Sequence, residues 1–74
     1  MPLIRIDITE GRSDAAIKTL MDTVQDCVVE AFKVPVKDRY QIITEHKPGR
    51  IILEDTGLGF ERTDQAIVIQ VFTS

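Results

Sequence analysis

The second residue of the chain, Pro2, has the clearest potential for chemistry. If Met1 is removed, Pro2 becomes the N-terminal residue and carries a free secondary amine on a rigid ring. An α-amino group titrates near roughly pH 7.7–8.0, and burial or a nearby cation lowers that value. A neutral amine suits a general base, whereas an ammonium suits a general acid or a partner for a carboxylate. If Met1 is retained, the acylated nitrogen has no basic lone pair, and Pro2 is only a small residue after the initiator.

Other reactive side chains occur singly. Cys27 is the only cysteine and His46 the only histidine, which excludes an internal disulfide and argues against a metal site. Cys27 lies among apolar residues, and we interpret it as a small buried hydrophobe. His46 is expected in a solvated polar loop. Tyr40 could donate a hydrogen bond to a substrate oxygen, or pack at a subunit interface with its hydroxyl in water.

Apolar periodicity predicts the elements that position these groups. Ile4, Ile6 and Ile8 alternate with polar residues and predict a strand over 3–8. Ser13 is a good N-cap, and the apolar stripe that follows predicts an amphipathic helix of about five turns. Val34-Pro35 ends this helix, because the residue before a proline avoids the α region. The stripe consists of Ile17, Leu20, Met21, Val24, Cys27, Val28, Ala31 and Phe32.

Further extended segments are predicted beyond the helix. After a tight turn over 36–39, residues 40–44 form a second strand, parallel to the first because a helix connects them. Residues 51–53 form a short strand or an extended piece. Residues 66–72 are apolar except at Gln70 and predict a strand covered on both faces. The fold class is therefore α/β (α+β), a single β-α-β unit with an additional C-terminal strand, in one domain over 1–74.

Size and composition narrow the class of protein. A chain of 74 residues buries only roughly 60% of its unfolded surface, and one helix covers only one face of the sheet. We therefore expect self-association, with a second subunit as the simplest cover for the other face. A net charge of −3 without a Lys or Arg run argues against nucleic acid. No apolar stretch is long enough to cross a membrane, and the N-terminus lacks the apolar region of a signal peptide. A lone thiol fits a location in the reducing cytoplasm.

The motifs together resemble the tautomerase superfamily, and most closely the N-terminal half of malonate semialdehyde decarboxylase-like proteins. Each motif is weak alone, but their order and spacing extend over nearly the whole chain. They are Met1-Pro2-Leu3, Glu10-Gly11-Arg12-Ser13-Asp14, Val34-Pro35, Asp38-Arg39-Tyr40-Gln41, His46-Lys47-Pro48-Gly49 and Leu53-Glu54-Asp55-Thr56-Gly57-Leu58-Gly59-Phe60.

The resemblance implies an activity and an assembly. It implies the β-α-β fold, an N-terminal proline exposed by removal of Met1, and assembly as a trimer or a hexamer. The reactions it implies are keto–enol tautomerisation, decarboxylation and hydration-type dehalogenation of small carboxylic acids. None of them needs a metal or an organic cofactor. Pro2 would then act as general base or acid on a small keto or enol carboxylate.

Two more residues take roles from the resemblance. Asp38 matches the aspartate that decarboxylase-like relatives place beside the proline, where it would orient water or the amine and support the ammonium form. Its alternative, compatible role is to cap the N-terminal end of the turn before the second strand. Arg12 matches an arginine that short tautomerases such as 4-oxalocrotonate tautomerase use for a substrate carboxylate, which a guanidinium fork suits. Its alternative role is a solvated turn residue.

The sequence also departs from these relatives. The second arginine of the short tautomerases falls at Tyr40. In the decarboxylase-like proteins, which are about twice as long, the first substrate-binding arginine falls at Ser74 and the second beyond it. The chain is either the first half of a two-unit protein, which its nearly all-apolar last strand favours, or a naturally short relative. The function hypotheses are a Pro2-dependent enzyme and a catalytically impaired fragment or non-catalytic oligomer-forming module. A third, for which the sequence offers no separate ligand motif, is a small-ligand-binding β-α-β domain of regulatory type.

Overall fold

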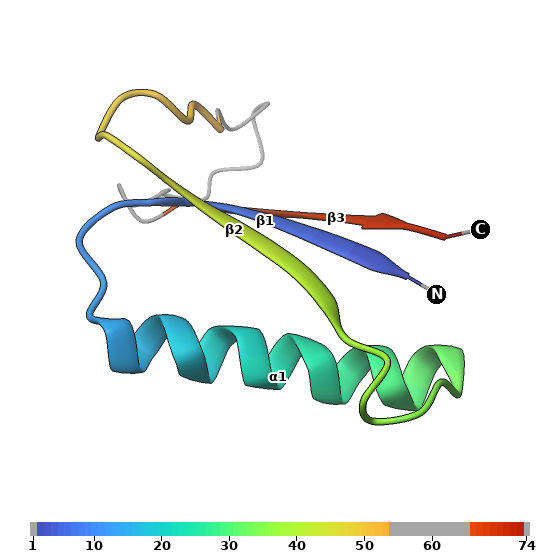
Figure 1. Cartoon of the computed structure of the whole chain (residues 1–74). Helices are drawn as coiled ribbons and strands as arrows, with labels where there is room; N and C mark the ends of the chain where they lie inside the picture. The colour runs from blue at the N-terminus through green and yellow to red at the C-terminus, as the bar shows by residue number, and fades with distance from the viewer. Residues whose placement is uncertain (1, 54–65, 74) are drawn as a thin grey trace, which may run out of the picture.

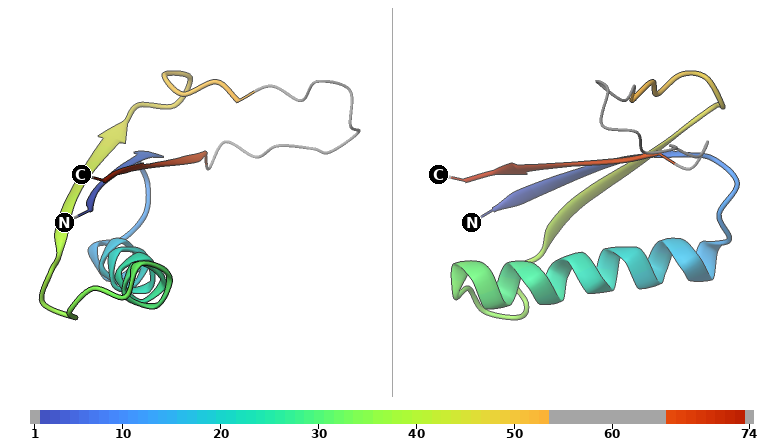
Figure 2. Two further views of the ribbon diagram at one scale, coloured as in Figure 1. Left: turned by 90° about the vertical axis from the view of Figure 1, so that its right-hand side faces the viewer. Right: turned by 180° about the vertical axis from the view of Figure 1, so that it is seen from behind.

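A computed structural model of the chain describes residues 2–53 and 66–73. Its elements in chain order are β1 (Leu3–Thr9), α1 (Asp14–Phe32), β2 (Tyr40–His46) and β3 (Ile67–Phe72). The three strands form one sheet in the order β2-β1-β3, and α1 lies on one side of it (Figure 1; Figure 2). This confirms the predicted β-α-β unit with an additional C-terminal strand. In the described part of the chain, no helix has both the length and the apolar character needed to span a membrane.

The central strand β1 has one parallel and one antiparallel neighbour. It pairs in parallel with β2, as the helical crossover between them requires. It pairs antiparallel with β3, an arrangement that the sequence did not predict. Leu3 lies opposite both Tyr40 and Phe72. The beginning of β1, the beginning of β2 and the end of β3 therefore lie at one end of the sheet.

Local signals set both ends of α1. Ser13 is extended, and its hydroxyl accepts a hydrogen bond from the Ala16 N–H at 3.1 Å, which confirms the predicted N-cap. At the other end, Lys33 adopts the left-handed conformation (φ 56°, ψ 39°), and its N–H donates to the Val29 carbonyl. A left-handed residue at this position commonly ends a helix. The helix thus ends before Val34-Pro35, as predicted.

The core lies between β1 and α1. Ile4, Ile6 and Ile8 are at most 1% exposed, and Val28 of α1 packs against them. At roughly 1.5–3 kcal/mol for each fully buried aliphatic side chain, these isoleucines stabilise the fold by several kcal/mol. Partly buried apolar side chains pack against this core, and they are Ile17, Leu20, Met21, Val24, Val34 and Ile43.

The prediction that the last strand is covered on both faces is wrong for the single chain. Ile67, Ile69 and Val71 point to the helix side of the sheet, as their partners in β1 do, yet they stay 39–46% exposed. An apolar groove of about 290 Å³, the α1/β3 groove, remains beside them. Cys27 lines this groove and is exposed, so its predicted burial is also wrong. The groove is lined by Thr23, Val24, Cys27, Val28, Ala31, Phe32, Ile69 and Val71.

The face of the sheet opposite α1, the open face, has an apolar and a polar end. Residues paired across strands share a face, so Leu3, Tyr40 and Phe72 lie together where β1 begins. Tyr40 and Phe72 are 47% and 48% exposed. At the other end, His46 Nε2 lies 2.7 Å from Asp7 Oδ1. The predicted loop position of His46 is wrong, because β2 continues past residue 44 to include it.

The connections around β2 differ from prediction in detail. The turn before β2 is closed by a 2.9 Å hydrogen bond from the Asp38 N–H to the Pro35 carbonyl, one residue earlier than expected. After β2, Gly49 takes a φ of 86° in a turn over 47–50. Residues 51–53 belong to no strand, so the strand interpretation of this segment is wrong. Most of the motif from Leu53 to Phe60 lies outside the described residues, as does Ser74.

Truncating the central core side chain tests this packing. Ile6→Ala should lower the free energy of unfolding by about 2–5 kcal/mol, because it removes buried methyl groups and leaves a cavity. Urea unfolding followed by circular dichroism measures the loss. Val36→Ala, at a position 73% exposed, is the control and should change stability by less than about 0.5 kcal/mol. Equal losses in the two variants would contradict the assigned core.

Candidate functional site

Pro2 is buried and lies directly before β1. Because Leu3 pairs with Tyr40, this end of β1 adjoins the beginning of β2. Asp38, two residues before Tyr40, is half-buried, and Tyr40 itself is 47% exposed. One end of the sheet therefore brings together three of the four predicted site residues: Pro2, Asp38 and Tyr40.

Arg12 lies away from this end. It follows β1, and its Nη1 donates a hydrogen bond of 3.4 Å to the Thr9 carbonyl. The seven residues of β1 lie between it and Pro2. At about 3.3 Å per residue, a strand of that length spans roughly 20 Å, more than an arginine side chain can bridge. A single chain thus does not bring Arg12 to Pro2.

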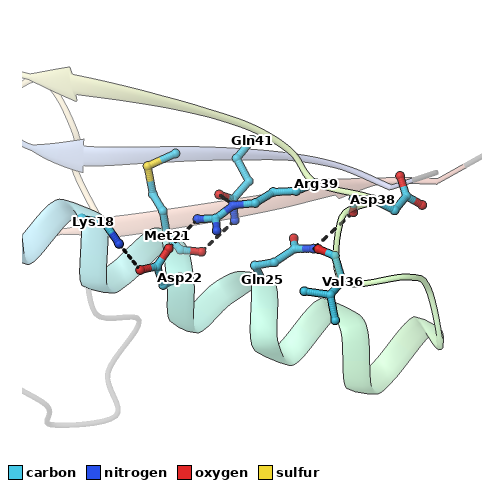
Figure 3. A network of polar contacts seen from close by, with 8 residues as sticks. All are labelled: Lys18, Met21, Asp22, Gln25, Val36, Asp38, Arg39 and Gln41. Atoms are coloured by element: carbon cyan, nitrogen blue, oxygen red, sulfur yellow. Dashed lines mark hydrogen bonds and ion pairs between the residues drawn. The ribbon is translucent and has the colours of Figure 1, made fainter.

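The turn that carries Asp38 is tied to α1 by a buried glutamine. Gln25 is 4% exposed, and its Nε2 donates to the carbonyls of Val36 and Asp38, each at 3.2 Å. Figure 3 shows the Asp38 side chain pointing away from α1 and from Gln25. Sequence reasoning missed Gln25. The available signal was its spacing, four residues after Met21 and three before Val28, which places an amide on the apolar stripe.

A second group of polar contacts holds the first residues of β2 against α1 (Figure 3). Arg39 donates to Gln41 Oε1 at 2.8 Å and to Asp22 Oδ1 at 2.9 Å. Lys18 donates to the other Asp22 oxygen at 2.7 Å, and Gln41 donates to the Met21 carbonyl at 2.8 Å. Arg39, the residue directly before β2, is therefore bonded both to α1 and to β2.

The same contacts set the charge state of Asp22. The hydrogen bond from Lys18, and then that from Arg39, hold the pKa of the Asp22 carboxyl below its usual range, because both donors favour the carboxylate. In the described ranges, no three His, Cys, Asp or Glu side chains group closely enough to hold a metal ion.

The fold and this arrangement define the class of protein. Residues 2–61 match the family model described as Tautomerase enzyme, and the chain belongs to the tautomerase family. It resembles two probable tautomerases of Bacillus subtilis (strain 168). It is 52% identical to YrdN over 71 residues, which are 96% of this chain and 55% of that protein. It is 30% identical to YusQ over 69 residues, 93% of this chain and 54% of that protein.

Solved structures extend the likeness to the decarboxylase branch. A crystal structure of FG41 malonate semialdehyde decarboxylase inhibited by 3-bromopropiolate matches with a TM-score of 0.85 and 46% identity, over 90% of this chain and 51% of that chain. A second malonate semialdehyde decarboxylase structure, described with decarboxylase and hydratase activities, matches with a TM-score of 0.82 and 45% identity. This match covers 90% of this chain and 52% of that chain. These findings confirm the resemblance drawn from the motifs. The chain spans about half the length of the relatives it matches.

The Asp22 contacts predict a pH-dependent contribution to stability. A folded-state pKa below the unfolded value gives stabilisation that is complete above the unfolded pKa and is lost as pH falls through the folded pKa. Asp22→Asn should therefore lower the urea midpoint at neutral pH, and the difference from wild type should vanish as the pH falls through the folded-state pKa of the Asp22 carboxyl. Since Asp22 is solvent-exposed, added salt should shrink the difference. Asp26→Asn is the control, and an equal, equally pH-dependent loss there would contradict the assignment.

Proposed function

We propose that this chain carries the active end of a tautomerase-superfamily enzyme whose base and acid is the amino-terminal Pro2, freed by removal of Met1. The substrates are small keto or enol carboxylic acids, which the enzyme tautomerises or decarboxylates. The observation that supports this most is the burial of Pro2 at the end of the sheet where Asp38 and Tyr40 also lie. Membership of the tautomerase family gives independent support.

The chemistry needs only an amine that accepts and returns a proton. In ketonisation, the neutral amine accepts the enol hydroxyl proton, and the resulting ammonium delivers a proton to the carbon of the C=C bond that does not carry the oxygen, which leaves a carbonyl group on the other carbon. In decarboxylation of a 3-oxo acid, an ammonium beside the carbonyl oxygen stabilises the enolate formed as carbon dioxide leaves. Burial of Pro2 favours the neutral amine, whereas the Asp38 carboxylate favours the ammonium. Tyr40 would donate a hydrogen bond to the substrate oxygen.

In this proposal a cationic side chain binds the substrate carboxylate, and this connects the reaction to assembly. Arg12 lies at the far end of β1 from Pro2, so in this proposal it meets a substrate only from a neighbouring copy. The open face and the α1/β3 groove expose apolar side chains that such neighbours, in a trimer or a hexamer, would cover. The ionised carboxylate of a small substrate would then lie between Pro2 of one chain and Arg12 of another.

A non-catalytic, oligomer-forming module of the same fold is the second candidate. It is favoured by the separation of Arg12 from Pro2 within one chain and by the uncovered side chains of β3. A chain spanning about half of its relatives can keep the fold and the association while lacking the cations that bind substrate.

Replacement of the proline tests the enzyme directly. Purified chain lacking Met1 should accelerate ketonisation of phenylenolpyruvate, and Pro2→Ala should lower kcat by roughly 10²–10⁴-fold, the usual contribution of a general acid–base group. Stopped-flow absorbance measures both rates. Pro48→Ala, in the turn after β2, is the matched proline control and should keep the wild-type rate. Equal rates for wild type and Pro2→Ala would rule out the proposed mechanism.

Native mass spectrometry tests the assembly. The expected result is a closed oligomer whose subunits are lighter by one methionine. Ile42→Glu, which places a charge on the open face, should shift the oligomer to smaller species, because a buried unpaired charge is strongly unfavourable. Ile52→Glu, at a position 71% exposed and outside the sheet, should leave it intact. A monomer that keeps Met1 would contradict the proposed active state.

A further inference from the structure

Gln25 is an exception in the packing of α1. Among the described residues, it and Thr9 are the buried polar or charged ones. Its spacing along the helix is that of a core residue, where an apolar side chain would pack without needing a hydrogen-bond partner. Burying a primary amide without partners costs free energy, so its presence here is explained by the groups it binds.

The partners of Gln25 match its chemistry. The Nε2 group has two N–H bonds, and it lies 3.2 Å from each of two carbonyl oxygens, those of Val36 and Asp38. These carbonyls flank Lys37 in the turn between α1 and β2. The Asp38 N–H is also bonded, to the Pro35 carbonyl at 2.9 Å. Both polar groups of the Asp38 backbone are therefore held, while its carboxylate points away from the helix (Figure 3).

The beginning of β2 has contacts with α1 other than those of Gln25. Arg39 is bonded to Asp22, and Gln41 to the Met21 carbonyl, and these contacts fasten the beginning of β2 to the helix. The hydrogen bonds of Gln25 instead hold the turn that precedes β2 in position against α1. That turn carries the one carboxylate at the Pro2 end of the sheet that sequence reasoning assigned to the site.

We propose that Gln25 is a positioning residue, which acts through the backbone of Asp38 to set the distance of that carboxylate from Pro2. This inference rests on the proposed function. With the turn released, the Asp38 carboxylate moves and its support of the Pro2 ammonium weakens. The effect of losing Gln25 therefore has the same direction as that of losing the Asp38 charge, and the two losses do not add.

The test uses the full chain with Met1 removed and four variants. Gln25→Met keeps the length of the side chain but donates no hydrogen bond, and Asp38→Asn removes the charge. The double variant combines the two, and Gln41→Met is the matched control, since it removes a helix–strand hydrogen bond of the same kind outside the turn. The readouts are kcat and KM with phenylenolpyruvate, and the pKa of the Pro2 amine from ¹⁵N NMR titration, which needs no turnover.

The expected result is a shared effect of Gln25 and Asp38. Gln25→Met should lower kcat by roughly 10- to 100-fold with little change in KM, as misplacement of a catalytic group does. It should also lower the pKa of the Pro2 amine, as Asp38→Asn does, because a carboxylate near an ammonium raises that pKa. The double variant should match Asp38→Asn alone, which a double-mutant cycle detects. Gln41→Met should leave kcat and the Pro2 titration at wild-type values.

Three outcomes would overturn the proposal. They are a folded Gln25→Met variant with wild-type kcat and Pro2 titration, losses that add in the double variant, and an Asp38→Asn variant without effect. If Gln25→Met does not fold, Gln25→Asn replaces it, because its amide is one methylene too short to reach both carbonyls. Failure of the proposed function is a different result: Pro2→Ala would not slow the reaction, while the NMR titration would still report whether Gln25 and Asp38 are coupled.

Discussion

The structure depends on the burial of one side of β1 against α1. Ile4, Ile6 and Ile8 have almost no contact with solvent, and β1 is the strand with a partner on each edge. That position fixes the parallel register with β2, because the helix must return the chain to the same end of the sheet. The register in turn places Tyr40 opposite Leu3 and so brings the turn that carries Asp38 to the end of the sheet where Pro2 lies.

The core and the candidate site therefore both depend on α1, the core on its apolar side chains and the site on one of its polar side chains. Along most of its length, α1 contributes apolar side chains that fill the space under the sheet. Near its C-terminal third it contributes an amide, which binds backbone carbonyls of the connecting turn. Apolar contacts are non-directional and tolerate small shifts, whereas hydrogen bonds to carbonyls require defined distances and angles. Hydrogen bonds from a side-chain amide are thus better suited than apolar contacts to hold the Asp38 carboxylate in one place.

Much of the fold and part of the site could be predicted from the sequence. The isoleucine alternation located β1, Ser13 and the three- and four-residue spacing located α1, and motif order identified the family. Other features depend on neighbours that periodicity does not specify. An apolar strand such as 66–72 looks alike whether it is covered or exposed, and Cys27 faces a groove that one chain leaves open. Gln25 interrupts an apolar stripe, and the sequence does not show that its partners are carbonyls of a later turn.

The identity of the residue at position 40 has a practical consequence for optical spectroscopy. The chain has no tryptophan, and Tyr40 is its only tyrosine. This residue is half exposed at the beginning of β2, at the same end of the sheet as Pro2. The phenol absorption and emission of the native protein therefore originate at a single point beside the candidate site. The molecule carries its own chromophore there, and ligand entry or a change in nearby charge can be followed without a label.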